Sequence, residues 1–169
     1  MRRSCTGSDM RYLMKQKMFS IGDQLTIKNE AGEDVFLVKG QIFSLGHKLS
    51  FQDMQGRELA FIQQKLLSFG PTYEIYHDGE LAATVKQHLF SFLRYSFTVD
   101  VPGPDDLEIQ GSFSDMEYTF TRGDQAVAQV SKRWFSLTDT YGVDVADGED
   151  DVLILASTVV EDMICHERK

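Results

Sequence analysis

The sequence predicts a mainly β protein, a closed twelve-stranded antiparallel β-barrel around a central C-terminal hydrophobic α-helix. Three observations lead to this fold class. A short apolar segment ending in or followed by serine recurs every 22 to 24 residues, a polar glycine turn recurs about halfway between these segments, and the C-terminal segment is apolar around most of a helical circumference. A period of this kind is typical of a repeated supersecondary unit.

The first series consists of six short segments, which we call the corners. They are Met18-Phe19-Ser20, Ile42-Phe43-Ser44, Leu66-Leu67-Ser68, Leu89-Phe90-Ser91, Ser112-Phe113-Ser114 and Trp134-Phe135-Ser136. The second series consists of six glycine turns, in which glycine supplies the positive φ that a tight turn needs. They are Ala31-Gly32-Glu33, Gln55-Gly56-Arg57, Asp78-Gly79-Glu80, Pro102-Gly103-Pro104, Arg122-Gly123-Asp124 and Asp147-Gly148-Glu149.

The segments between corners and turns are short and rich in β-branched and aromatic residues, as in Val35–Val38, Tyr73–Tyr76 and Tyr95–Val99. This composition indicates strands. The first strand spans about residues 11–18, and six corners and five glycine turns then separate twelve strands. A sheet of this size must curl or split to manage its edges, and closure into a barrel removes the edges.

The pattern predicts a helix over about residues 150–165, after the sixth glycine turn. Carboxylates precede it and basic residues follow it, which suits the helix dipole at both ends. Its apolar run is shorter than the roughly 20 residues that a bilayer span needs. Because a twelve-stranded barrel encloses more space than its own side chains fill, we expect this helix inside it. A two-sheet sandwich with the helix packed outside remains the alternative.

Length and composition favour one domain over residues 10–169, preceded by a disordered tail over residues 1–9. The net charge of −9 argues against broad binding to nucleic acid, which requires neutralisation of phosphates. Cys5 and Cys165 are too few and too far apart in the sequence for a disulfide framework. The N-terminal residues contain no hydrophobic signal segment. A cytoplasmic protein is the expectation.

Two stretches carry a resemblance to a known family. Residues 25–45, with Gly32 at their turn, and residues 141–151, followed by the apolar helix, are similar to the LURP-one-related family. That family resembles the tubby C-terminal domain and the phospholipid scramblases, which implies a twelve-stranded barrel around a central hydrophobic helix. Tubby domains bind phosphoinositide head groups and scramblases move lipids in a calcium-dependent way, so the resemblance implies lipid binding as an expectation.

Charges segregate along the predicted barrel. If the strands run up and down, all corners lie at one end, the corner rim, and all glycine turns at the other, the turn rim. Basic residues gather near the corners: Lys15, Lys17, Lys39, Lys48, Lys65, Lys86, Arg94, Lys132 and Arg133. Acidic residues gather near the turns: Glu30, Glu33, Asp34, Asp53, Glu58, Asp78, Glu80, Asp105, Asp106, Asp124, Asp147, Glu149, Asp150 and Asp151.

The corner rim is therefore the candidate binding surface for anionic lipid head groups. The candidate residues are Lys39, Lys65, Lys86, Lys132 and Arg133. Each lysine or arginine near an anionic surface contributes roughly 1 kcal/mol. The plainer interpretation is that polar turns simply carry charge and that the corner aromatics point into the barrel end.

No catalytic or cofactor motif stands in the chain, and the four histidines have no metal-ligand spacing. We therefore expect no enzyme, no cofactor and no metal site. The acidic residues Asp144, Asp147 and Glu149 are weak calcium candidates, because calcium prefers clustered oxygen ligands. Helix capping and dipole compensation account for the same acidic segment more simply.

The functional hypothesis is a non-catalytic tubby-like module that contacts an anionic membrane lipid surface, without a transmembrane span. The alternative is a protein-interaction or regulatory scaffold that touches no lipid and binds an unidentified protein. A scramblase-like protein or a small-ligand carrier ranks below both, because a carrier needs a pocket at a barrel mouth and a plug helix would fill it.

Overall fold

The computed structural model of the chain describes residues 9–15, 23–41, 45–91, 94–113, 115–133 and 139–166. The corners at 18–20, 42–44 and 134–136 lie outside these residues, as do Ser114 and all of the predicted tail except Asp9. The elements are β1 Met10–Lys15, β2 Gln24–Asn29, β3 Asp34–Gly40, β4 Lys48–Asp53, β5 Glu58–Gln64, β6 Thr72–His77, β7 Glu80–Ser91, β8 Arg94–Asp100, β9 Leu107–Ser112, β10 Glu117–Arg122, β11 Gln125–Ser131, β12 Thr140–Val145 and α1 Asp151–His166.

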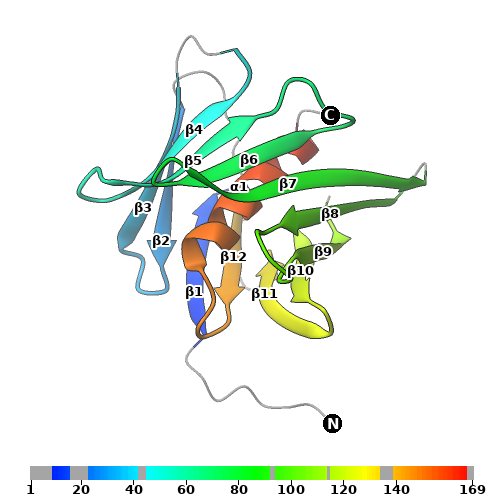
Figure 1. Cartoon of the computed structure of the whole chain (residues 1–169). Helices are drawn as coiled ribbons and strands as arrows, with labels where there is room; N and C mark the ends of the chain where they lie inside the picture. The colour runs from blue at the N-terminus through cyan, green and yellow to red at the C-terminus, as the bar shows by residue number, and fades with distance from the viewer. Residues whose placement is uncertain are drawn as a thin grey trace.

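The strands form one closed antiparallel barrel, which confirms the predicted fold class. Each strand pairs with its neighbours in sequence, and β1 pairs with β12 from Met10↔Val145 to Lys15↔Thr140 to close the sheet. Odd-numbered strands therefore run from the turn rim to the corner rim, and even-numbered strands run back (Figure 1).

The glycine turns share a local geometry. Gly32, Gly56, Gly79 and Gly123 all have positive φ, from 57° to 83°. Each of the four hairpins they close has a register shift next to the turn, as between Ile27 and Lys28 in β2–β3. A residue in the left-handed region followed by a bulge is a common way to close a hairpin. The sequence period thus corresponds to a repeated bulged hairpin.

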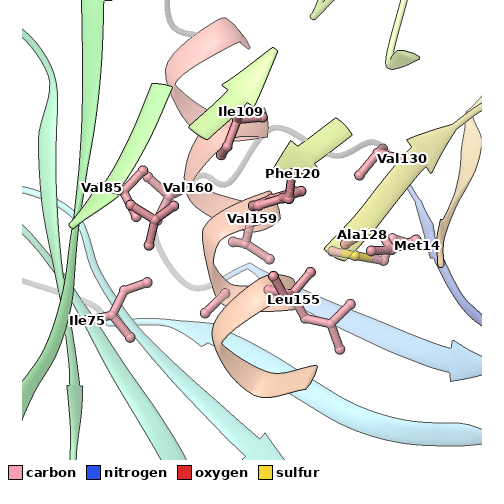
Figure 2. Close-up of a cluster of buried hydrophobic side chains, with 14 of the residues drawn as sticks. Met14, Ile75, Val85, Ile109, Phe120, Ala128, Val130, Leu155, Val159 and Val160 are labelled. Carbon is pink, nitrogen blue, oxygen red and sulfur yellow. The ribbon is translucent and has the colours of Figure 1, made fainter. Parts of the chain in front are cut away.

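The helix α1 occupies the barrel interior, so the sandwich with an external helix is wrong. Residues from Ile154 to Ile164 are all buried, and Leu155 and Val159 have no exposed surface. Figure 2 shows Leu155, Val159 and Val160 among side chains of the surrounding strands. Those labelled are Met14, Ile75, Val85, Ile109, Phe120, Ala128 and Val130.

The start of α1 is fixed at the turn rim by two carboxylates. The Oδ1 atom of Asp150 accepts a hydrogen bond from the backbone N–H of Leu153 at 3.0 Å, which is the geometry of an N-cap. The hydroxyl of Tyr12 donates to Oδ2 of Asp151. The acidic residues before the helix thus hold it in the barrel mouth, and the helix runs from there toward the corner rim.

Candidate functional site

The corner rim contains two loops that lie against each other, β3–β4 and β5–β6. The backbone N–H of His47 donates to the side-chain oxygen of Gln64 at 3.1 Å, and the N–H of Gln64 donates to the His47 carbonyl at 2.8 Å. A Cβ atom on Gly46 would lie 2.8 Å from Cδ2 of Leu66, so Leu66 packs directly over Gly46. The described parts of the two loops therefore form one unit.

This unit exposes large apolar side chains. Leu45 is 83% exposed, Leu67 94% and Phe69 fully exposed, and Leu66 is also exposed. The corner at Ser112-Phe113 behaves differently, because Phe113 is buried and packs edge-to-face against Phe97 at a centroid distance of 4.8 Å. The interpretation that corner aromatics point into the barrel end therefore holds for Phe113, whereas the aliphatic corner residue Leu67 is exposed.

Three lysines lie at the strand ends from which these two loops leave. Lys39 lies near the end of β3, Lys48 begins β4 and Lys65 follows β5, so they occupy consecutive strand ends at the corner rim. The ammonium group of Lys65 lies 3.6 Å from a carboxylate oxygen of Glu74. Both side chains belong to the surface, where such a pair contributes about 1 kcal/mol or less.

Of the other predicted site residues, Lys86 lies near Lys65, because it pairs with Thr72, whose carbonyl accepts a hydrogen bond from the backbone N–H of Lys65. Lys86 is on β7, and its ammonium group lies 2.5 Å from Oδ2 of Asp100. Lys132 and Arg133 follow β11, which β12, β1 and β2 separate from β3 around the barrel. Both backbone N–H groups donate to Oε1 of Glu117. The structure thus brings Lys39, Lys48, Lys65 and Lys86 to neighbouring strands of the barrel, and it places Lys132 and Arg133 in another sector.

The calcium candidates at the turn rim have basic partners. Asp144 binds the Arg11 guanidinium through both oxygens, at 2.6 and 2.8 Å. Glu149 binds Arg122 in the same way, at 2.8 and 2.9 Å. Asp147 is exposed. In the described part of the chain, no three His, Cys, Asp or Glu side chains converge in a way suited to a metal ion. Asp144 joins β12 to β1, and Glu149 joins the turn before α1 to β10, so both carboxylates link parts of the barrel.

Two carboxyl groups lie inside the barrel near the corner end of α1. Glu161 and Asp162 are fully buried, and Glu161 accepts a hydrogen bond from the Cys165 thiol at 3.1 Å. Burial raises the pKa of Glu161 to about 8, an effect that the Tyr118 hydroxyl and the thiol oppose and that Asp162 adds to. Burial also raises the pKa of Tyr118 and Tyr141, and these carboxyl groups raise both further.

The sequence analysis missed this polar cluster and the exposure of Leu45 and Phe69. The pair Glu161-Asp162 interrupts the apolar pattern of α1 between Val160 and Met163, and this was the available signal. For the loop, the signal was an apolar run between two strands that ends in Gly70-Pro71.

An open depression of about 450 Å³ lies on the outer wall of the barrel. Residues of β5 and β6 line it, among them Phe61 and Tyr76, together with Asp78 and Gly79 at the turn rim. It is therefore on the wall beside acidic residues, and not at the barrel mouth where a ligand carrier would need it. Separately, none of the described helical residues forms a stretch with the length and hydrophobicity of a transmembrane helix.

Comparison with known proteins agrees with this architecture. A protein of Arabidopsis thaliana, solved by X-ray crystallography, superposes with a TM-score of 0.64 over 95% of this chain and 92% of that chain, at 16% sequence identity. This likeness concerns the fold. A curated relative, Uncharacterized protein YxjI of Bacillus subtilis (strain 168), is 35% identical over 153 residues, covering 90% of this chain and 92% of the relative. The model of the LURP-one-related family matches residues 10–162, and the chain therefore belongs to the LURP-one-related family.

Proposed function

We propose that this protein is a non-catalytic binding module that docks its corner rim on surfaces of anionic phospholipid head groups. The observation that carries the proposal is the position of Lys39, Lys48 and Lys65 on consecutive strand ends. Lysine ammonium groups at one end of a rigid barrel are suited to contact several phosphates at once.

The negative net charge of the chain does not prevent this contact, because many of the acidic residues lie far from the corner rim. The chain carries a net charge of −9, and many of its acidic residues lie near the turn rim. A seven-residue strand such as β3 spans roughly 20 Å, whereas charges are screened over about 8 Å at physiological ionic strength. The acidic residues of the turn rim are therefore largely screened from a membrane at the corner rim.

Co-sedimentation with vesicles tests the proposal. Phosphatidylcholine vesicles with and without phosphoinositides are compared at low and physiological salt, with the wild-type chain and a Lys39→Glu, Lys48→Glu variant. We expect binding that requires phosphoinositide, weakens with salt and is lost in the variant, because each reversal replaces attraction with repulsion.

A matched control reverses two charges at the turn rim, Lys28→Glu and Arg57→Glu. It alters the net charge by the same amount, and we expect it to bind like the wild-type chain. Wild-type binding that is absent, or indifferent to lipid charge, contradicts the proposal. Equal loss in both variants contradicts the assignment to the corner rim. Capture of a protein partner by a chain that ignores vesicles would favour the scaffold hypothesis.

A further inference from the structure

The apolar side chains of Leu45, Leu66, Leu67 and Phe69, which we call the apolar tip, are exposed on the two joined loops at the corner rim. Monomeric proteins usually bury such side chains or scatter them singly over the surface. Here four come from adjacent loops. A concentration of this kind indicates an interaction surface.

Two polar groups of the loop of the apolar tip, the Ser68 hydroxyl and the backbone N–H of Lys65, are hydrogen-bonded to nearby carbonyls. The Ser68 hydroxyl lies 3.1 Å from the Lys65 carbonyl and 2.9 Å from the Gly70 carbonyl. The backbone N–H of Lys65 donates to the Thr72 carbonyl at 2.9 Å. Gly70, at a φ of 77°, permits the tight return of the chain. Since these polar groups are paired within the loop, its outer surface can enter an environment of low polarity at reduced cost.

We propose that the apolar tip inserts into the interfacial region of an anionic bilayer while Lys39, Lys48 and Lys65 contact the head groups around it. This inference rests on the proposed function and adds a second, salt-resistant contribution to it. Interfacial anchors place their apolar side chains roughly 5 to 10 Å into the boundary between head groups and acyl chains. Leu67 and Phe69, the most exposed of the four, would enter deepest.

The shape and charge of the surface favour a bilayer over other occupants. A second copy of this chain docking through the same surface would bring two sets of Lys39, Lys48 and Lys65 into one interface, because a two-fold interface uses the same patch on both subunits. Like charges brought together in this way oppose association. The apolar tip is also formed by two projecting loops. A protein partner would need a groove that matches them, whereas a bilayer needs none.

A tryptophan reporter locates the tip directly. The chain has one tryptophan, Trp134, so the reporter Phe69→Trp is placed in a Trp134→Phe background of the full chain. With phosphoinositide-containing vesicles, we expect a blue shift of the emission and quenching by lipids brominated on their acyl chains. The matched control is Leu81→Trp in the same background. Leu81 is an exposed leucine next to the turn rim, and it should show neither change.

A second pair of variants needs no reporter. At physiological salt, Leu67→Ser with Phe69→Ser should lower the vesicle partition coefficient about 10-fold or more, because two large apolar side chains are lost from the contact. The control Met54→Ser with Leu81→Ser, also at exposed positions, should stay within about 2-fold of the wild-type value. Thermal melts check that all variants are folded.

The outcomes separate the two proposals. Insertion is overturned if the wild-type chain co-sediments, the Phe69→Trp reporter shows neither a blue shift nor quenching, and the Leu67→Ser, Phe69→Ser variant binds as well as the wild-type chain. Head-group binding would then still stand. Absence of wild-type co-sedimentation at either salt overturns the proposed function, and insertion with it. A wild-type dimer in light scattering that the tip variant converts to a monomer also overturns insertion, in favour of a second copy.

Discussion

The Cys165 thiol donates a hydrogen bond to Oε1 of Glu161, one turn earlier on α1, at 3.1 Å. This contact lies at the corner end of the barrel, where Glu161 is fully buried and its pKa is raised to about 8. The described groups nearest to it are Tyr118, Tyr141 and Asp162, which are acidic or neutral. The folded state therefore binds a proton at neutral pH that the unfolded chain releases.

This proton makes the free energy of unfolding depend on pH. The pKa of Glu161 is about 8 in the fold against 4.5 for the free side chain, so the stability that Glu161 contributes is fully present below pH 4.5 and is lost as pH rises to 8. The Glu161→Gln variant keeps a neutral hydrogen-bonding group and should lose that decline, gaining on the order of a few kcal/mol over the wild-type chain above pH 8. Urea unfolding across this pH range measures it.

The control for this measurement is Glu80→Gln, at an exposed position on β7. It should preserve the wild-type pH profile. Parallel profiles for the wild-type chain and Glu161→Gln would contradict the assignment of the raised pKa to Glu161.

Leu155→Asp should abolish folding. Leu155 has no exposed surface and lies in the middle of the barrel interior, so the substitution would bury an unpaired carboxylate. Circular dichroism and soluble yield measure the effect. Leu67→Asp makes the same substitution at a leucine that is 94% exposed, and it should melt like the wild-type chain.

A milder variant keeps this prediction measurable. Leu155→Ala should fold and lose about 2 to 5 kcal/mol, because it leaves a cavity in a closed core. A loss below 1 kcal/mol would mean that the helix is not enclosed as described.

Gly111→Ala should destabilise the β9–β10 pair strongly. Gly111 faces Tyr118 across the pair at a φ of 148°, and an added Cβ would lie 2.3 Å from the carbonyl oxygen of Glu117. That oxygen belongs to the backbone, so the strands must shift, and we expect a loss of more than about 3 kcal/mol in urea unfolding.

Gly32→Ala provides the comparison for that variant. Gly32 also has a positive φ, of 82°, but a Cβ there meets no atom within 4 Å. Only the conformational cost of about 1 to 2 kcal/mol remains. Equal losses in the two variants would show that φ alone, without the close approach at Gly111, governs both positions.

Much of the architecture could be predicted from local patterns. Glycines such as Gly32 and Gly56 terminate strands through their own backbone preference, and the alternation of β-branched and aromatic residues indicates strands without reference to the rest of the chain. Because consecutive strands joined by short turns must pair antiparallel, the number of turns determined the number of strands. The apolar circumference of residues 152–164 likewise required a surrounding barrel.

Only the tertiary structure decided how individual side chains are used. Phe113 is buried whereas Leu67 is exposed, although both lie at corners, because the direction of a side chain depends on the path of its loop. The pairing of Arg11 with Asp144 joins residues 133 positions apart and exists only once β1 closes against β12. The sequence by itself thus determined the strands, their order and the plug helix through local preferences. The burial of Glu161 and the position of the apolar tip depend on contacts between distant segments, and packing alone sets them.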